Sequence, residues 1–140
     1  MTSLAYKLVK KIADKKAVDA LIPILKEEND TARFYAAKAL GGIGSQKAVD
    51  ALAEALNDED YSVRYMAAKA LVNVGSTPAV DALIDALKNG NESAREIAAK
   101  SLGDLGDTCA ISALVAAEND SCEAVRKAAR ESLEKLRATN

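Results

Sequence analysis

The chain repeats itself at a fixed period, and this feature limits the folds open to it more than any other. The segment Tyr61–Gly75 has a close counterpart upstream at Asp30–Gly44 and another, equally spaced, downstream at Glu92–Gly106, which defines a 31-residue period. A more divergent fourth copy begins at Glu123. Self-similarity at a fixed spacing is the signature of a repeat architecture, in which each unit packs against its neighbours.

Each period also holds a second apolar segment, which begins Ala-Val-Asp-Ala-Leu at residues 17–21, 48–52 and 79–83, and Ala-Ile-Ser-Ala-Leu at 110–114. Neither segment is long enough to form a stable helix alone in water. Stacked units would bury a continuous core, so we predict an all-α, right-handed α-solenoid of about nine helices.

The turns between helices are expected near residues 14–16, 28–30, 44–46, 58–60, 75–77, 89–91, 106–108 and 119–122. Within each repeat, the helix that begins Ala-Val-Asp-Ala-Leu comes first, and the helix of the Tyr61–Gly75 kind comes second. Three of these second helices should end at Gly44, Gly75 and Gly106, because glycine is the usual left-handed stop of a helix. Pro23 lies inside its predicted helix and should bend or break it.

The repeats divide the chain into one domain with two terminal units. We expect an N-terminal half-repeat at 1–15, full repeats at 16–46, 47–77 and 78–108, and a capping repeat at 109–140. The half-repeat follows from an overlay of Ala5, Lys7, Val9 and Ile12 on Ala36, Lys38, Leu40 and Ile43. In the last copy, Arg130 and Glu134 replace small residues of the earlier copies, which is typical of a polar cap.

Composition argues against several classes of function. The 140 residues contain no His and no Trp, and the net charge is −2. Histidine is the usual acid–base group and metal ligand near neutral pH, so no catalytic residues, metal or cofactor are expected. The charge gives no support for binding to nucleic acid or to a membrane surface. No long apolar run and no signal-like N-terminus is found, and two cysteines fit a cytoplasmic location.

Cys109 and Cys122 fall at opposite ends of one short predicted helix. At 1.5 Å per residue they would lie roughly 15–20 Å apart. That separation is too large for a disulfide. A reactive thiol at Cys122, near a helix N-terminus, stays open.

The repeat unit resembles the short HEAT-like repeat of the phycobilisome-lyase type. The residues that carry the likeness are Val63-Arg64, Ala67-Ala68, Ala70-Leu71, Gly75, Ala79-Val80 and Leu83. The resemblance covers nearly the whole chain and implies a scaffold whose second helices line a concave binding face. Some relatives are enzymes. Deoxyhypusine hydroxylase holds iron through His-Glu pairs, and this chain has no His. HEAT-like DNA glycosylases present a basic groove with aromatic residues that include Trp, whereas this chain has no Trp and is slightly acidic.

Four arginines recur at the repeat spacing, one near the start of each second helix: Arg33, Arg64, Arg95 and Arg126. A cation near a helix N-terminus opposes the helix dipole, so each needs a carboxylate or carbonyl partner. Asp60 precedes Arg64, but the equivalent places hold Asn29, Asn91 and Cys122, so the partner must vary or come from an adjacent turn. We interpret the row as a structural ladder, with anion binding as the alternative.

The candidate binding face carries aromatic and basic residues on the second helices. Tyr61, Tyr65 and Lys69 project opposite the predicted core face of their helix, at about 100° per residue. An exposed tyrosine there is a candidate anchor for a partner. The proposed set consists of Phe34, Lys38, Tyr61, Tyr65, Lys69 and Lys100. Tyr35, Met66 and Ile97 share a flanking position and are expected to be half buried between repeats.

The sequence therefore predicts a non-catalytic scaffold that binds another protein on its concave face. Weak self-association is compatible with the sequence. The alternative is a bilin-lyase-like accessory protein that handles a tetrapyrrole, with lysines meeting its propionates and tyrosines stacking on its rings. No obvious acid–base residue is present for that chemistry.

Overall fold

The computed structural model describes residues 3–139, and this part of the chain contains α- and 3-10 helices and no strand. The α-helices are α1 (Ser3–Ile24), α2 (Asp30–Ile43), α3 (Val49–Ala55), α4 (Tyr61–Val74), α5 (Thr77–Asn89), α6 (Glu92–Leu105), α7 (Ile111–Ala117) and α8 (Glu123–Ala138). Short 3-10 helices, η1 (Gln46–Ala48) and η2 (Thr108–Ala110), lead into α3 and α7. The prediction of an all-α chain is confirmed.

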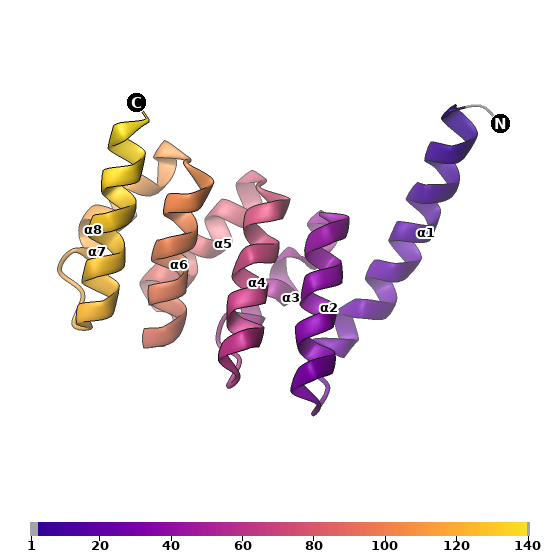
Figure 1. The fold of residues 1–140 in the computed structure, drawn as a ribbon, viewed down its shortest axis with the longest axis horizontal. Helices are drawn as coiled ribbons and strands as arrows, with labels where there is room; N and C mark the ends of the chain where they lie inside the picture. The colour runs from indigo at the N-terminus through magenta and orange to yellow at the C-terminus, as the bar shows by residue number, and fades with distance from the viewer. Residues whose placement is uncertain (1–2, 140) are drawn as a thin grey trace.

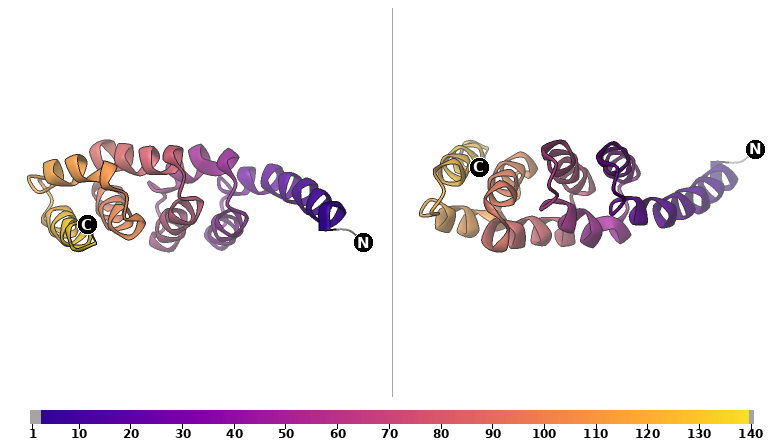
Figure 2. Two further views of the ribbon diagram at one scale, coloured as in Figure 1. Left: turned by 90° about the horizontal axis from the view of Figure 1, so that it is seen from above. Right: turned by 90° about the horizontal axis from the view of Figure 1, so that it is seen from below.

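The helices form two layers along one axis. Helices α2, α4, α6 and α8 stand side by side in one layer, and α3, α5 and α7 form a row behind them, as Figures 1 and 2 show. Helices α1 and α8 lie at opposite ends of the row (Figure 1). This is the α-solenoid that the repeat period predicted. None of the helices within residues 3–139 has both the length and the apolar character needed to cross a membrane.

Three glycines end the second helices as predicted. Gly44, Gly75 and Gly106 have φ angles of 73°, 63° and 75°. This left-handed conformation strains residues that carry a Cβ. The N–H of each glycine donates to a carbonyl four residues earlier; for Gly44 the acceptor is Leu40, at 3.0 Å. The chain can therefore leave each second helix abruptly and start the next repeat.

The turn expected at residues 14–16 is wrong, because α1 runs without a break from Ser3 to Ile24. The position equivalent to the three stop glycines is occupied by Ala13. Alanine is the best helix former and resists the left-handed stop. The half-repeat helix therefore continues into the next one, and residues 3–139 contain eight α-helices instead of about nine. Pro23 acts only at the end of this helix, which stops one residue later.

The core lies between the two layers and is built from repeated leucines. Nine leucines have almost no exposed surface: Leu40, Leu52, Leu56, Leu71, Leu83, Leu102, Leu114, Leu133 and Leu136. Burying one such side chain contributes about 1.5–3 kcal/mol. Small residues such as Ala67 and Ala98 separate them on the second helices and are fully buried. The second helices are thus fixed on one side, which leaves their outer surface free for another purpose.

Candidate binding cleft

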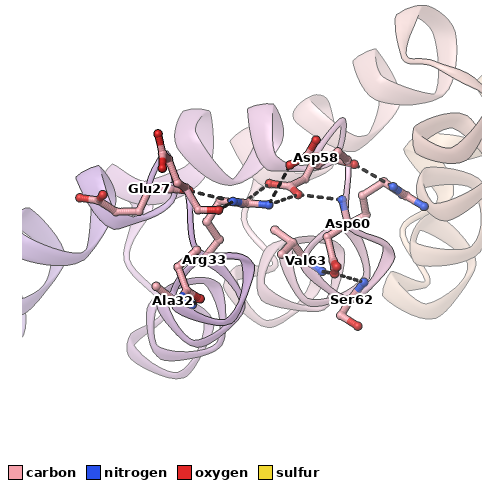
Figure 3. A network of polar contacts seen from close by, with 11 residues as sticks. Glu27, Ala32, Arg33, Asp58, Asp60, Ser62 and Val63 are labelled. Carbon is pink, nitrogen blue, oxygen red and sulfur yellow. Dashed lines mark hydrogen bonds and ion pairs between the residues drawn. The ribbon is translucent and has the colours of Figure 1, made fainter.

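Two of the ladder arginines, Arg33 and Arg95, join one repeat to the next. The Nε and Nη2 atoms of Arg33 donate to the two carboxylate oxygens of Asp58, at 2.8 and 3.1 Å, and Nη1 donates to the carbonyls of Glu27 and Glu28 (Figure 3). Asp58 stands in the turn of the following repeat, so the partner comes from the adjacent turn. The guanidinium also satisfies carbonyls of the turn between α1 and α2. The hydrogen bond to Asp58 raises the pKa of Arg33.

The same arrangement recurs in the third repeat, where Arg95 binds both carboxylate oxygens of Asp120 at 2.9 and 3.1 Å. This bond lowers the pKa of Asp120. Arg126 donates to the Asp120 carbonyl at 2.7 Å. Bidentate pairs of this kind are among the stronger polar contacts in proteins. The row therefore lies inside the stack, between repeats.

Arg64 is the exception in the ladder. It donates to the carbonyl of Asp58 at 2.8 Å, but its Nε is buried without a hydrogen-bond partner. Arg33 and Arg95 each find their aspartate at the same distance along the chain, and the position at that distance from Arg64 holds Asn89. The Asn89 amide instead donates to Asp85 at 2.8 Å. The junction between the second and third repeats thus lacks the ion pair that ties the other two.

One repeat position sets how closely neighbouring second helices approach. A Cβ added to Gly41 of α2 would lie 2.8 Å from Cα and Cβ of Ala70, and one added to Gly103 of α6 would lie 2.4 Å from Oγ of Ser132. We call the contact between two neighbouring second helices a seam. The seams between α2 and α4 and between α6 and α8 are therefore closely packed at a glycine. The same position in α4 is Val72. Because a packed core does not absorb the extra carbons of a valine, α4 and α6 cannot close in the same way.

A cleft of about 400 Å³ lies along this seam. Tyr61, Tyr65, Lys69 and Val72 line it from α4, and Glu96, Ile97, Lys100, Ser101 and Asp104 line it from α6. Its volume is within the range of ligand pockets. The structure therefore brings four of the six predicted binding residues, Tyr61, Tyr65, Lys69 and Lys100, to one place.

The two tyrosines form the exposed wall of the cleft. Tyr61 is 61% exposed and Tyr65 is 48% exposed. Their rings are stacked, with centroids 6.4 Å apart and 21° between the planes. The Lys69 ammonium lies 5.8 Å from the Tyr65 ring centroid, and the Arg64 guanidinium lies 5.6 Å from that of Tyr61. The result is a stacked aromatic pair bordered by cations.

The charges around the cleft are partly neutralised within α6 and α8. Lys100 is paired with Glu96 at 3.0 Å, and this hydrogen bond raises the pKa of Lys100. Asp104 is paired with Lys135 at 2.9 Å. Lys69 is exposed, and within residues 3–139 no carboxylate lies within ion-pair distance of it. It is the cation best placed to meet an incoming carboxylate.

Phe34 and Lys38, the other two residues of the predicted set, lie outside the cleft, on α2. Phe34 is half buried and meets Tyr35 edge to face, with ring centroids 5.1 Å apart. The Lys38 ammonium lies 6.0 Å from the Tyr35 ring centroid. The expectation for Tyr35 is wrong, since it is 58% exposed while Ile97 at the same repeat position is 8% exposed. Within residues 3–139 no second helix covers this flank of α2, because α1 does not turn back onto it.

Sequence reasoning did not single out the residues that form the cleft floor, above all Val72 and Ser101. The available signal was the interrupted series Gly41, Val72, Gly103. In residues 3–139 no group of three His, Cys, Asp or Glu side chains is placed to hold a metal ion. Cys109 and Cys122 are free thiols. A hydrogen bond with Asp107 raises the pKa of Cys109.

The fold is an α-solenoid of two-helix repeats with an open cleft between two of its second helices. A family model for HEAT repeats matches residues 3–63, 18–94 and 49–134, so the chain belongs to the HEAT repeat family. A search of curated proteins finds no match.

Solved structures support the same assignment. Human deoxyhypusine hydroxylase is 27% identical with a TM-score of 0.72, and the match covers 86% of this chain and 43% of that one. The complex of CpcE and CpcF of phycocyanin lyase from Nostoc sp. PCC7120 is 32% identical with a TM-score of 0.61, over 87% of this chain and 54% of that one. An engineered protein shares the fold at 22% identity and a TM-score of 0.53, over 94% and 67%. The predicted short HEAT-like repeat is confirmed, and the chain spans about half the length of the first two structures.

Proposed function

We propose that the chain is a non-catalytic scaffold that binds a partner protein in the cleft between α4 and α6. The observation that carries the proposal is the exposed stacked pair Tyr61 and Tyr65 beside a cleft of about 400 Å³. Aromatic residues at the centre of an interface are typical anchors. Both tyrosines point away from the packed core, so packing within the chain does not account for them.

The geometry favours a partner segment with a flat apolar side chain next to a carboxylate. The apolar group would lie on the tyrosine rings and enter the cleft toward Val72 and Ile97. The carboxylate would meet Lys69, because Lys100 is already held by Glu96. Phe34 and Lys38 would extend the contact on α2. The two free cysteines fit the cytoplasmic location expected from the sequence.

Capture from a lysate of the source cells tests this proposal. The immobilised full chain is compared with Tyr65→Ala, Lys69→Ala and a control, Val115→Ala, which alters an exposed apolar residue on α7. Tyr65→Ala should weaken binding about tenfold or more without changing the melting temperature. Lys69→Ala should act weakly and mainly at low salt, as a rim charge does. The proposal is wrong if the partner binds Tyr65→Ala normally and covers the face carrying Asp50, Glu54, Asp81 and Asp85.

A second candidate function is a bilin-lyase-like accessory role toward a tetrapyrrole chromophore. It is favoured by the 32% identity to the phycocyanin lyase complex. The flat tyrosine pair could stack on a tetrapyrrole ring, and Lys69 could pair with a propionate. Mixing the chain with a bilin distinguishes the two functions. A shifted visible absorption band that Tyr65→Ala abolishes would favour this role, and an unchanged bilin spectrum would exclude it.

A further inference from the structure

The N-terminal end of the solenoid has an uncovered helix flank. In the later second helices, Ala70, Ser101 and Ser132 are 1%, 6% and 3% exposed, because each packs against the preceding second helix. The equivalent residue of α2, Ala39, is exposed. Tyr35 on the same flank is also exposed, and both residues line a shallow depression between α1 and α2. We name this uncovered surface of Ala32, Tyr35 and Ala39 the open flank.

The chain also carries a helix of the kind that would fill the open flank. Residues 3–13 occupy the half-repeat position, and their apolar residues Leu4, Leu8, Val9 and Ile12 are 66%, 53%, 66% and 59% exposed. An exposed apolar stripe of this size usually marks an interaction site. We name residues 3–13 the leading segment. The part of the chain that the structure describes leaves this stripe uncovered.

The leading segment cannot reach the open flank of its own chain, because α1 is continuous through residues 14–16. Figure 1 shows the first part of α1 leading away from α2. A helix that continues where a repeat should turn is the geometry of segment exchange between identical chains. In a twofold pair, each copy gives one leading segment and receives one.

Charge supports a second copy as the occupant. The leading segment contains three lysines and no acidic residue, while the whole chain has a net charge of −2. The rest of the chain is therefore acidic overall. Exposed Glu27, Glu28 and Asp30 stand at the turn that leads into α2, and Asp30 lines a depression with Tyr35. A basic leading segment thus finds carboxylates at this turn, beside the open flank, whose own depression is lined by one cation, Lys38.

We propose that two copies of this chain pair by exchange, each placing its leading segment on the open flank of the other. The site is incomplete in one copy alone. This pairing uses the end of the solenoid and leaves the cleft between α4 and α6 uncovered, so it competes with the proposed function only for the extension on α2, where Lys38 lines the same depression.

Light scattering after size-exclusion chromatography, over a range of concentrations, tests the proposal with two variants. Leu8→Asp places a carboxylate in the apolar stripe of the leading segment, and Ala39→Glu places one on the open flank. Both positions are exposed in one copy, so each variant should keep the helical circular dichroism spectrum of the wild type. The wild type should form a dimer, and each variant should raise its dissociation constant about tenfold or more. Val115→Asp on α7 is the matched control and should dimerise normally.

Mixing the two variants separates exchange from unspecific sticking of apolar surfaces. The Leu8→Asp copy keeps an unchanged open flank, and the Ala39→Glu copy keeps an unchanged leading segment. The mixture can therefore form one of the two exchanged contacts, and it should give a heterodimer weaker than the wild-type dimer. A wild type that is monomeric at every concentration would overturn the proposal. So would a dimer insensitive to both variants, or a mixture that stays monomeric. Capture of a different protein by the open flank of a monomeric chain would likewise assign the surface to another partner.

Discussion

A ladder arginine can bind carbonyls of the turn before its own helix and also reach an aspartate of the next repeat. Arg33 and Arg95 do both, through carbonyls of their own turn and an aspartate of the following one. Arg64 reaches only the carbonyl of Asp58; at the aspartate's place in the repeat the chain has Asn89, the last residue of α5, whereas Asp58 and Asp120 lie in turns. One amide in place of a carboxylate therefore loosens the junction that borders the cleft.

Restoring the missing carboxylate should stabilise the chain. A charge-assisted hydrogen bond contributes about 1.5–3 kcal/mol, whereas an acidic residue at the end of α5 loses about 0.3–1 kcal/mol against the helix dipole. We expect Asn89→Asp to raise the free energy of unfolding by no more than about 1 kcal/mol in urea titrations, because it also loses the hydrogen bond to Asp85 and places two carboxylates four residues apart on α5. In an Arg64→Met background the gain should disappear. An equal gain in both backgrounds would mean that the new carboxylate does not reach Arg64.

The Arg95–Asp120 pair should make the free energy of unfolding depend on pH in the acidic range. The pKa of Asp120 is lowered in the folded chain, so its contribution is present above the unfolded value of about 4 and is lost as pH falls through the folded value. Asp120→Asn should cost about 3 kcal/mol at neutral pH, since it leaves a guanidinium largely buried without its carboxylate. Urea unfolding at several pH values should show this difference shrinking below about pH 4. A difference that stays constant into acid would contradict the assignment.

At the scale of helices, a single side chain decides whether a seam is closed or open. Gly41 and Gly103 let α2 and α6 meet their neighbours closely, and Val72 holds α4 and α6 apart. A glycine inside a helix costs about 1 kcal/mol relative to alanine. The glycines thus lower the helix stability of α2 and α6 and allow close packing at two seams. The third seam, between α4 and α6, has the larger side chain of Val72 and contains the cleft.

Adjacent glycines in α2 provide a matched test of this packing. Gly41→Ala should lower the free energy of unfolding by about 1–2 kcal/mol, because the clash with Ala70 outweighs the better helix propensity. Gly42→Ala should raise it by about 0.5–1 kcal/mol, since an added Cβ there meets no atom within 4 Å. Thermal and urea unfolding of both variants measures the contrast. Two changes of the same sign would show that the α2–α4 seam is not as close as described.

Val72→Gly should turn the open seam into a closed one. The added glycine costs about 1 kcal/mol of helix stability, but α4 and α6 would then approach as α2 and α4 do. A crystal structure of the variant should show a smaller separation of the two helices and the loss of most of the cleft. An unchanged cleft would mean that the end of α5 near Asn89, not Val72, sets the separation.

At the scale of the whole molecule, features that obey the repeat period were predictable and exceptions to it were not. The stops at Gly44, Gly75 and Gly106 depend on a local backbone preference, so the sequence alone located them. The continuous helix α1 depends on Ala13, a local exception that the overlay of residues 2–13 passed over.

The cleft and the arginine partners were harder to predict, because they depend on contacts between repeats. Val72 and Asn89 act there on residues far away in the chain, and a reading of each repeat by itself does not reveal such effects. Tyr61, Tyr65 and Lys69, which line the cleft, were predicted as exposed residues because their exposure follows from helical periodicity. Lys100 joined the predicted set because it repeats the position of Lys69.

Site-specific photocrosslinking tests most directly whether the cleft is the binding site. The photoreactive amino acid p-benzoylphenylalanine replaces Tyr65 in one variant and Val115 in another, and both are expressed in the source cells and irradiated. We expect a discrete crosslinked product at position 65 that is missing at position 115. In the partner protein, the crosslinked residue should stand next to an acidic residue that can reach Lys69. Crosslinks at position 115 but not at 65, or the same products at both, would contradict the assignment of the cleft between α4 and α6 as the binding site.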